Sequence, residues 1–185
     1  MGGLTCYNLD TQATRTYNNQ NSSITENNIF ALCTDEDGDL WVGTTAGLFR
    51  YDYDKQLLEP IHTSPLDHAF VFHLSSDREG CIWVGTRYNG LVSYNKNTGR
   101  THHYKAGTAD GQLTDDYITT LLVSRSGQLW VGTNNGGLFR KNADATFESM
   151  IRSGVLTETC IYGLAESLDG SLWITAGKSI YRLDP

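Results

Sequence analysis

Short apolar segments alternate with polar turns along the whole chain, and the alternation repeats. The most regular unit is the Leu-Trp-Val-Gly-Thr segment at residues 40–44. It returns at residues 82–86 as Ile-Trp-Val-Gly-Thr, unchanged at 129–133, and in a weaker form, Leu-Trp-Ile-Thr-Ala, at 172–176. The four tryptophans of the chain therefore follow one another at intervals of 42, 47 and 43 residues. A period of this length predicts a propeller or a solenoid.

Each repeat reads as a small antiparallel sheet. An apolar segment such as 29–34 precedes the tryptophan segment, a turn ending in glycine joins the two, and a Gly-Leu pair opens a third strand. A fourth strand is indicated more weakly, for example at 57–62. The tryptophan segment is apolar at consecutive positions, so both of its faces must be covered, as in sheets stacked around an axis. We therefore predict an all-β propeller of four-stranded antiparallel blades with the tryptophans in the blade core: Trp41, Trp83, Trp130 and Trp173.

The repeats divide residues 1–185, which we expect to form a single propeller segment. Residues 3–8 match 47–52, so the chain starts inside a repeat, and we expect 3–17 to be the end of a preceding blade. Further blades are expected at 29–62, 70–105 and 118–151, with an incomplete blade at 161–184. Phasing of this kind predicts about four repeats of a larger propeller. Two alternatives stay open, namely closure of the last blade by the amino-terminal strand and completion of the ring by a second copy of the chain.

Charge and hydropathy exclude two classes of partner. The formal net charge is −7 and the 14 Lys and Arg residues are scattered, whereas a nucleic-acid footprint needs clustered basic residues. No apolar run approaches the roughly 18 residues that a membrane span requires, so we expect no direct membrane insertion. The first residues also lack the basic and apolar regions of a signal peptide.

The sequence gives little support for metal, cofactor or catalytic chemistry. Asp35, Asp37 and Asp39 alternate as in a calcium loop, but Ala46 stands where a bidentate glutamate is needed, so a hairpin turn is the better interpretation. The five histidines fit no zinc spacing, and the four cysteines match no CxxC pattern. We expect no metal, no cofactor and no catalytic residues.

Binding chemistry is expected where the repeats differ from one another. In an antiparallel meander, the hairpins between second and third strands and the connections between blades emerge on one face. The hairpins there carry a guanidinium, an aromatic ring and amides suited to hydroxyl-rich ligands. The candidate ligand-binding residues are Arg87, Tyr88, Asn89, Asn134 and Asn135. The alternative is that Asn-Gly and Asn-Asn-Gly simply form good turns.

The segment 28–52, with its Asp-x-Asp-Gly-x-Leu-Trp-Val-Gly-Thr-x-x-Gly-Leu-x-x-Tyr-Asp pattern, resembles the two-component regulator propeller repeat. The next two repeats resemble it nearly as well, and the fourth has lost its Gly-Thr and Gly-Leu pairs. The resemblance implies a seven-bladed type of propeller in the periplasmic sensor region of a bacterial hybrid two-component histidine kinase.

Such a sensor region would detect oligosaccharides, and its partners would be the remaining blades or a second copy of the chain. This part of the protein would not itself be an enzyme. Two alternatives stay open beside the sensor, namely a structural or dimerisation scaffold without a small-molecule site and a propeller lyase or hydrolase.

Overall fold

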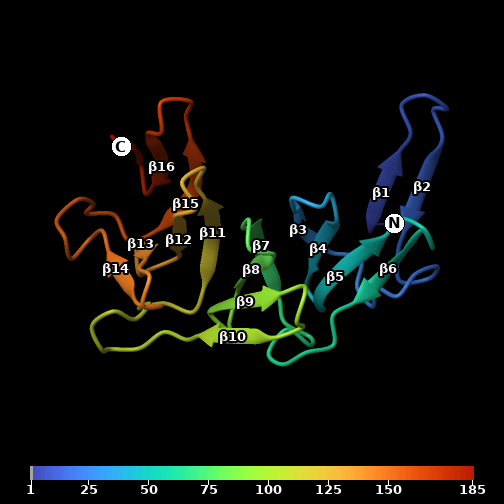
Figure 1. Ribbon diagram of the computed structural model, residues 1–185, viewed down its shortest axis with the longest axis horizontal. Helices are drawn as coiled ribbons and strands as arrows, with labels where there is room; N and C mark the ends of the chain where they lie inside the picture. Colours follow the sequence, from blue (N-terminus) through green and yellow to red (C-terminus); the bar gives the residue numbers. More distant parts are fainter. Residues whose placement is uncertain (1) are drawn as a thin grey trace.

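The computed structural model describes residues 2–185, and within them the chain forms strands and turns without any helix (Figure 1). Five antiparallel sheets follow one another along the sequence. The first is the hairpin of β1 (Leu4–Tyr7) and β2 (Thr14–Tyr17). Blade 1 contains β3 (Ile29–Thr34), β4 (Leu40–Thr44), β5 (Gly47–Asp52) and β6 (Leu57–Pro60).

The other three sheets repeat this order. Blade 2 contains β7 (Val71–Ser76), β8 (Cys81–Thr86), β9 (Leu91–Asn95) and β10 (Thr101–Tyr104). Blade 3 contains β11 (Ile118–Val123), β12 (Leu129–Thr133), β13 (Leu138–Lys141) and β14 (Phe147–Ser149). Blade 4 contains β15 (Ile161–Glu166), β16 (Leu172–Ala176) and β17 (Ser179–Leu183).

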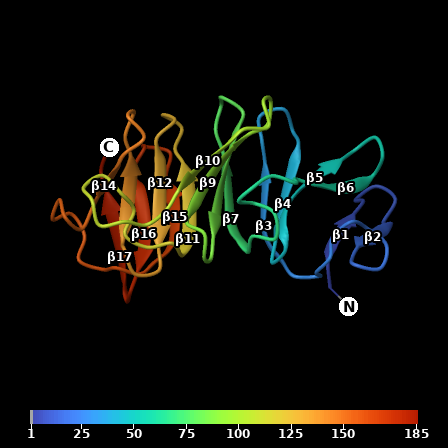
Figure 2. The ribbon, with the colours of Figure 1, turned by 90° about the horizontal axis from the view of Figure 1, so that it is seen from below.

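Every blade is a simple meander in which sequential strands pair as neighbours. The first strands β3, β7, β11 and β15 lie next to one another and form the inner row of an arc, and the later strands extend outwards (Figure 1). Figure 2 shows the blades side by side along the length of the molecule. The predicted all-β propeller segment of four-stranded antiparallel blades is therefore confirmed.

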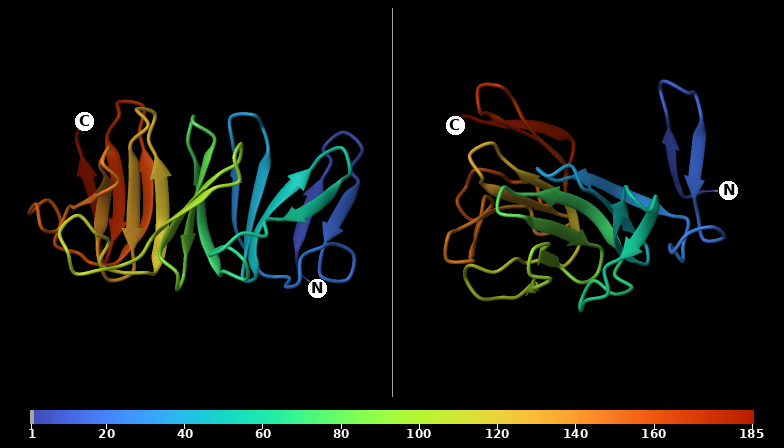
Figure 3. Two further views of the ribbon diagram at one scale, coloured as in Figure 1. Left: turned by 60° about the horizontal axis from the view of Figure 1, so that its bottom comes forward. Right: turned by 45° about the vertical axis from the view of Figure 1, so that its right-hand side comes forward.

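The meander gives the arc two distinct faces (Figure 3). We call the loop face the one that carries the hairpins after β4, β8, β12 and β16 and the connections 61–70, 105–117 and 150–160. The turn face is the opposite one and carries the tight turns after the first and third strands of each blade, such as 35–39 and 77–80. A strand-by-strand reversal of direction fixes which loops share a face, so the sequence already assigns each loop to its side.

Hydrophobic residues fill the junctions between successive sheets. Trp41 is buried between blades 1 and 2, Trp83 between blades 2 and 3, and Trp130 packs against the core between blades 3 and 4. Each indole thus packs towards the blade that follows it. The prediction that Trp173 lies in the blade core is wrong. Its ring lies on the side of blade 4 turned away from blade 3, where no further blade covers it among the described residues, and is 43% exposed.

The glycine that follows each Trp-Val pair permits this close stacking. A Cβ built on Gly85 would lie 2.8 Å from Cγ2 of Ile118 in the next blade, and one built on Gly43 would lie 2.5 Å from Cγ1 of Val71. A side chain at either position would overlap the first strand of the neighbouring blade. In blade 4 the equivalent residue is Thr175, which is exposed, so the substitution meets no such restriction.

Candidate functional site

The loop-face hairpins share one backbone framework that does not depend on the residue at their first turn position. The buried hydroxyls of Thr44, Thr86 and Thr133 donate to the carbonyls of Gly47, Gly90 and Gly137 and accept a backbone N–H from within the turn. The next residue of each hairpin donates its N–H to the carbonyl just before a first strand. These first turn residues are Thr45, Arg87, Asn134 and, in blade 4, Gly177. Because threonine, arginine, asparagine and glycine all occupy this position, the fold leaves its side chain free.

At Arg87 the free position carries a charge, and three aromatic rings surround it. The guanidinium carbon lies 5.3 Å from the ring centroids of both Phe70 and Tyr88 and 5.5 Å from that of Tyr117. Phe70 and Tyr117 come from the connections that lead into β7 and β11, so the contacts join the loops of two blades. Cation–π contacts of this kind hold a guanidinium in place while leaving its charge without a counter-ion.

Two more aromatic residues, Phe30 of blade 1 and Phe72 of blade 2, extend this group. Phe30 packs against Phe70 and Phe72, with ring centroids 4.7 and 5.8 Å apart, and Phe72 meets Tyr117 edge to face at 5.3 Å. We call the whole group the Arg87 cluster. Its members are Arg87, Phe30, Phe70, Phe72, Tyr88 and Tyr117. Tyr88 is 63% exposed and Phe30 48% exposed, so the cluster presents a partly open aromatic surface at the loop face.

A bulge at the start of each first strand positions Phe30 and Phe72. The pairing register shifts between Ile29 and Ala31 and again between Val71 and His73, leaving the intervening phenylalanine outside the ladder. Bulges redirect a side chain in this way and are common beside functional sites. Hairpin reasoning missed Phe30, Phe70, Phe72 and Tyr117, although aromatic residues recur at the loop-face ends of the first strands.

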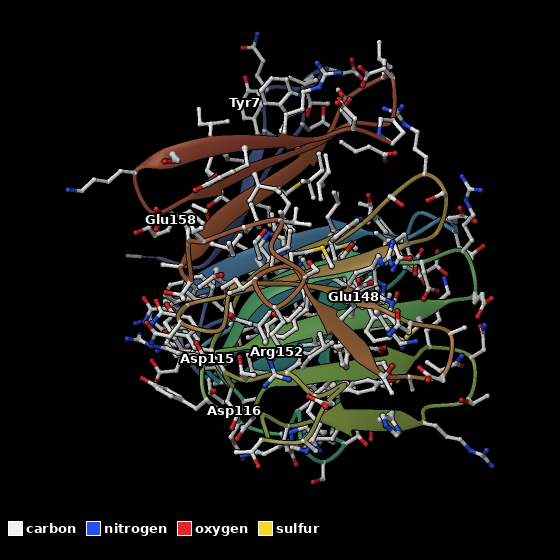
Figure 4. The ribbon with its side chains drawn as sticks, turned by 90° about the vertical axis from the view of Figure 1, so that its left-hand side faces the viewer. Tyr7, Asp115, Asp116, Glu148, Arg152 and Glu158 are labelled. Atoms are coloured by element: carbon white, nitrogen blue, oxygen red, sulfur yellow. The ribbon has the colours of Figure 1, made fainter. Side chains whose placement is uncertain are left out.

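The three predicted asparagines lie on the loop face, and the structure records no contact between their side chains and those of the cluster, although the Asn134 backbone N–H donates to the Tyr117 carbonyl at 3.0 Å. The backbone carbonyl of Asn89 is bonded to the His103 ring, and the Asn134 side chain lies 3.8 Å from the Cys160 sulfur. The Asn135 backbone N–H donates to Asp115. Figure 4 shows Asp115, Asp116 and Glu158 along one edge of the molecule, where the connections emerge. The structure thus brings together Arg87 and Tyr88, and the role of the three asparagines in binding stays a prediction.

The turn face is held by buried ionic and polar contacts. The carboxylate of Asp35 accepts hydrogen bonds from the Trp41 indole at 2.9 Å and from Lys96 of blade 2 at 2.6 Å. Burial opposes ionisation of Asp35, but these hydrogen bonds outweigh it and lower the pKa of the carboxyl below its ordinary value. Asp77 repeats the contact to the indole of Trp83 at 2.8 Å. These aspartates stand six residues before their tryptophans, where the two later repeats have serine.

A groove of about 820 Å³ also opens on the turn face, and sequence reasoning did not predict it. It is lined by the first turns of blades 1 to 3 together with Trp83 and Lys141. Three of its four carboxylates already have partners, since Asp35 binds Lys96, Asp77 binds Trp83, and Glu36 pairs with Arg78 at 3.3 Å. Asp35, Asp77 and Glu36 therefore serve packing within and between blades, and the open aromatic surface makes the Arg87 cluster the stronger candidate site.

The aspartates that alternate as in a calcium loop are bound to a lysine instead. The ammonium of Lys96 lies 2.6 Å from a carboxylate oxygen of both Asp35 and Asp37. Among residues 2–185, no group of three or more His, Cys, Asp and Glu side chains has the arrangement of a metal site. His73, which is half-buried, accepts a hydrogen bond from the Leu121 N–H, and burial lowers its pKa.

A family model described as the two component regulator propeller matches residues 23–46, 65–88 and 112–135. Each match runs from a blade connection through the first two strands into the hairpin. The fourth repeat, which has lost its Gly-Thr and Gly-Leu pairs, is not among the matched segments. No match was found among curated proteins.

Solved structures with the same arrangement of blades include two extracellular domains of putative hybrid two component systems from B. thetaiotaomicron. The domain of BT4673 is 25% identical, with a TM-score of 0.78 over 98% of this chain and 24% of that one. The domain of BT3049 is 20% identical, with a TM-score of 0.78 over 99% of this chain and 24% of that one. This chain thus spans about a quarter of the length of these relatives.

Virginiamycin B lyase from Staphylococcus aureus shares the fold at 17% identity. Its TM-score is 0.73 over 97% of this chain and 59% of the lyase. At this identity the likeness shows the fold alone. No helix among residues 2–185 could cross a membrane, since the described chain contains only strands, turns and irregular segments.

Proposed function

Because the chain carries two-component regulator propeller repeats and has the fold of extracellular domains of hybrid two-component systems, we propose that it is part of a periplasmic ligand-sensing region. The parent protein would be a hybrid two-component histidine kinase, and the ligand an oligosaccharide. The proposed role is recognition without a chemical step. Binding would bias a conformational equilibrium of the receptor, and a ligand can do so only if it prefers one of the two states.

One observation supports this proposal most directly, namely the open aromatic surface of the Arg87 cluster. The C–H-rich face of a pyranose packs well against an exposed ring, and the neighbouring guanidinium offers hydrogen-bond donors to hydroxyl groups. Tyr88 supplies both a ring and a hydroxyl and is 63% exposed on the loop face. Because Thr86 fixes the backbone of this hairpin, the hairpin does not depend on the Tyr88 side chain for its stability.

Calorimetric titration of the 185-residue chain with a panel of neutral and acidic oligosaccharides tests the proposal. At least one sugar should bind, and Tyr88→Ala should lower the affinity for that sugar at least about tenfold, because the stacking surface is lost. Tyr53→Ala is the matched control, since Tyr53 is a 56% exposed tyrosine beside a turn on the opposite face. A panel in which no sugar binds would refute the sensor proposal for this part of the receptor.

The asparagine predictions can be separated in the same titration. Asn134→Ala and Asn135→Ala should leave affinity unchanged if these residues only shape their turn. A loss of affinity comparable with that of Tyr88→Ala would restore them to the binding site.

A second role, in assembly, is favoured by the outward side of blade 4. Trp173 is 43% exposed and Ile180 70% exposed there, and exposed apolar groups of this size promote association. We propose that this side packs against a further blade or a second copy of the chain. The molar mass in solution tests the second copy: Ile180→Lys should convert a dimer to a monomer.

A further inference from the structure

We propose that Arg87 selects acidic sugars, so that the ligand of the loop face is an oligosaccharide containing uronic acid. This inference rests on the proposed sensing function and narrows its ligand class. The carboxylate of the sugar would pair with the Arg87 guanidinium while a pyranose face stacks on Tyr88.

The first step of the argument is that the fold does not require arginine at position 87. The Arg87 backbone N–H donates to the Phe70 carbonyl at 3.0 Å, and Asn134 makes the equivalent bond to Tyr117 at 3.0 Å with an uncharged side chain. Thr45 and Gly177 complete the set in the other blades. The charged side chain is therefore an addition to the hairpin and not a condition for forming it.

The second step is that the charge of Arg87 has no counter-ion. No ion pair joins its guanidinium to a carboxylate of residues 2–185, although most other arginines of the chain have such partners. The ring faces of Phe70, Tyr88 and Tyr117 hold it instead. Guanidinium presents parallel N–H donors that match a carboxylate in a bidentate pair, and the aromatic surroundings orient it beforehand.

The third step is that the two acidic residues that precede Tyr117 in the chain already have internal partners. Asp115 accepts the backbone N–H groups of Tyr117 and Asn135, at 3.0 and 2.6 Å. Asp116 accepts the Ala106 N–H at 2.7 Å and lies 3.5 Å from the Lys105 ammonium. These carboxylates stabilise the connection 105–117 and leave Arg87 available. With a net charge of −7 the whole chain does not attract anions at long range, so any preference for them must arise locally.

Matched pairs of sugars provide the test. Trigalacturonate and galactotriose of the same linkage differ only at C6, as do cellotriuronate and cellotriose. In calorimetric titrations of the full 185-residue chain, the acidic member of at least one pair should bind about tenfold or more tightly than its neutral counterpart. Arg87→Gln should abolish that preference, and Tyr88→Ala should lower the affinity for both sugars of the pair.

Arg100→Gln is the control for net charge, because Arg100 is exposed in a turn of the same blade on the opposite face. It should leave the preference intact. Neutral sugars that bind as tightly as acidic ones would overturn the inference while the sensing function stands. A preference that survives Arg87→Gln would overturn it as well, and binding of no sugar at all would overturn both proposals.

Discussion

The two faces of the arc are built from the same meander, yet they use their side chains in opposite ways. On the turn face the first two repeats share a polar contact, in which Asp35 and Asp77 each bind the indole of the tryptophan six residues later. On the loop face the repeats differ, and the hairpin position occupied by Arg87 holds threonine, asparagine or glycine elsewhere. The comparison teaches that polar residues of the turn face serve packing within and between blades, whereas the divergent residues of the loop-face hairpins are available for ligands.

Removing the buried carboxylate of the turn face should have the largest effect on stability. Asp35→Ala should lower the free energy of unfolding by about 1–3 kcal/mol, because it leaves the Trp41 N–H buried without an acceptor and leaves the Lys96 ammonium with the exposed carboxylate of Asp37, at 2.6 Å, as its nearest partner. Urea unfolding followed by tryptophan fluorescence measures the loss. Asp37 binds the same lysine but its side chain is 77% exposed, so Asp37→Ala should cost less than about 1 kcal/mol. Equal losses from the two variants would show that burial of Asp35 does not matter.

Between the faces, the glycines of the second strands should be nearly as sensitive. Gly85→Ala should lower the free energy of unfolding by about 1–3 kcal/mol, since its Cβ would overlap Ile118 of the next blade. The control is Gly163→Ala, where the new Cβ would meet only the Thr175 hydroxyl at 3.2 Å. A neutral effect at Gly85 would mean that the blades are not stacked as closely as described.

On the loop face, substitutions of framework residues and of proposed ligand-binding residues should differ in their effect on stability. Thr86→Val should lower the free energy of unfolding by about 1–2 kcal/mol, because the buried hydroxyl bonds both Gly90 and Asn89. Tyr88→Ala in the same hairpin should change it by less than about 0.5 kcal/mol, because the side chain is largely exposed. Chemical unfolding compares the two variants. A large loss from Tyr88→Ala would assign that ring to the framework.

Acid should weaken the turn face by a smaller and gradual amount. The pKa of Asp35 is lowered in the folded chain, so its contribution to stability is complete above the unfolded value of about 3.9. As the pH falls below 4 towards the folded pKa, that contribution is lost. The difference in stability between the wild type and Asp35→Asn should therefore shrink below pH 4 and stay constant above pH 5. A difference that grows on acidification would contradict the assignment.

The repeat made the blades predictable, because each second strand presents the same apolar face and the same glycine. The repeat also led to the wrong prediction for Trp173, because the other three tryptophans are covered by a following blade and Trp173 is not. The site was predicted only in part. Arg87 and Tyr88 stand out in a hairpin, but Phe30 and Phe72 reach the loop face through strand bulges, and a bulge leaves no mark in hydrophobic alternation. The turn-face groove is formed by the first turns of three blades together, so the sequence of one repeat does not predict it.

Hydroxyl-radical footprinting, with and without the oligosaccharide that binds the chain most tightly, tests the division between the two faces most directly. Oxidation of exposed aromatic side chains reports which surface the ligand covers. We expect the ligand to protect Tyr88 and Phe30 while leaving the equally exposed Tyr53 and Tyr7 unchanged. Protection of Tyr53 or Tyr7, with Tyr88 still oxidised, would contradict the account.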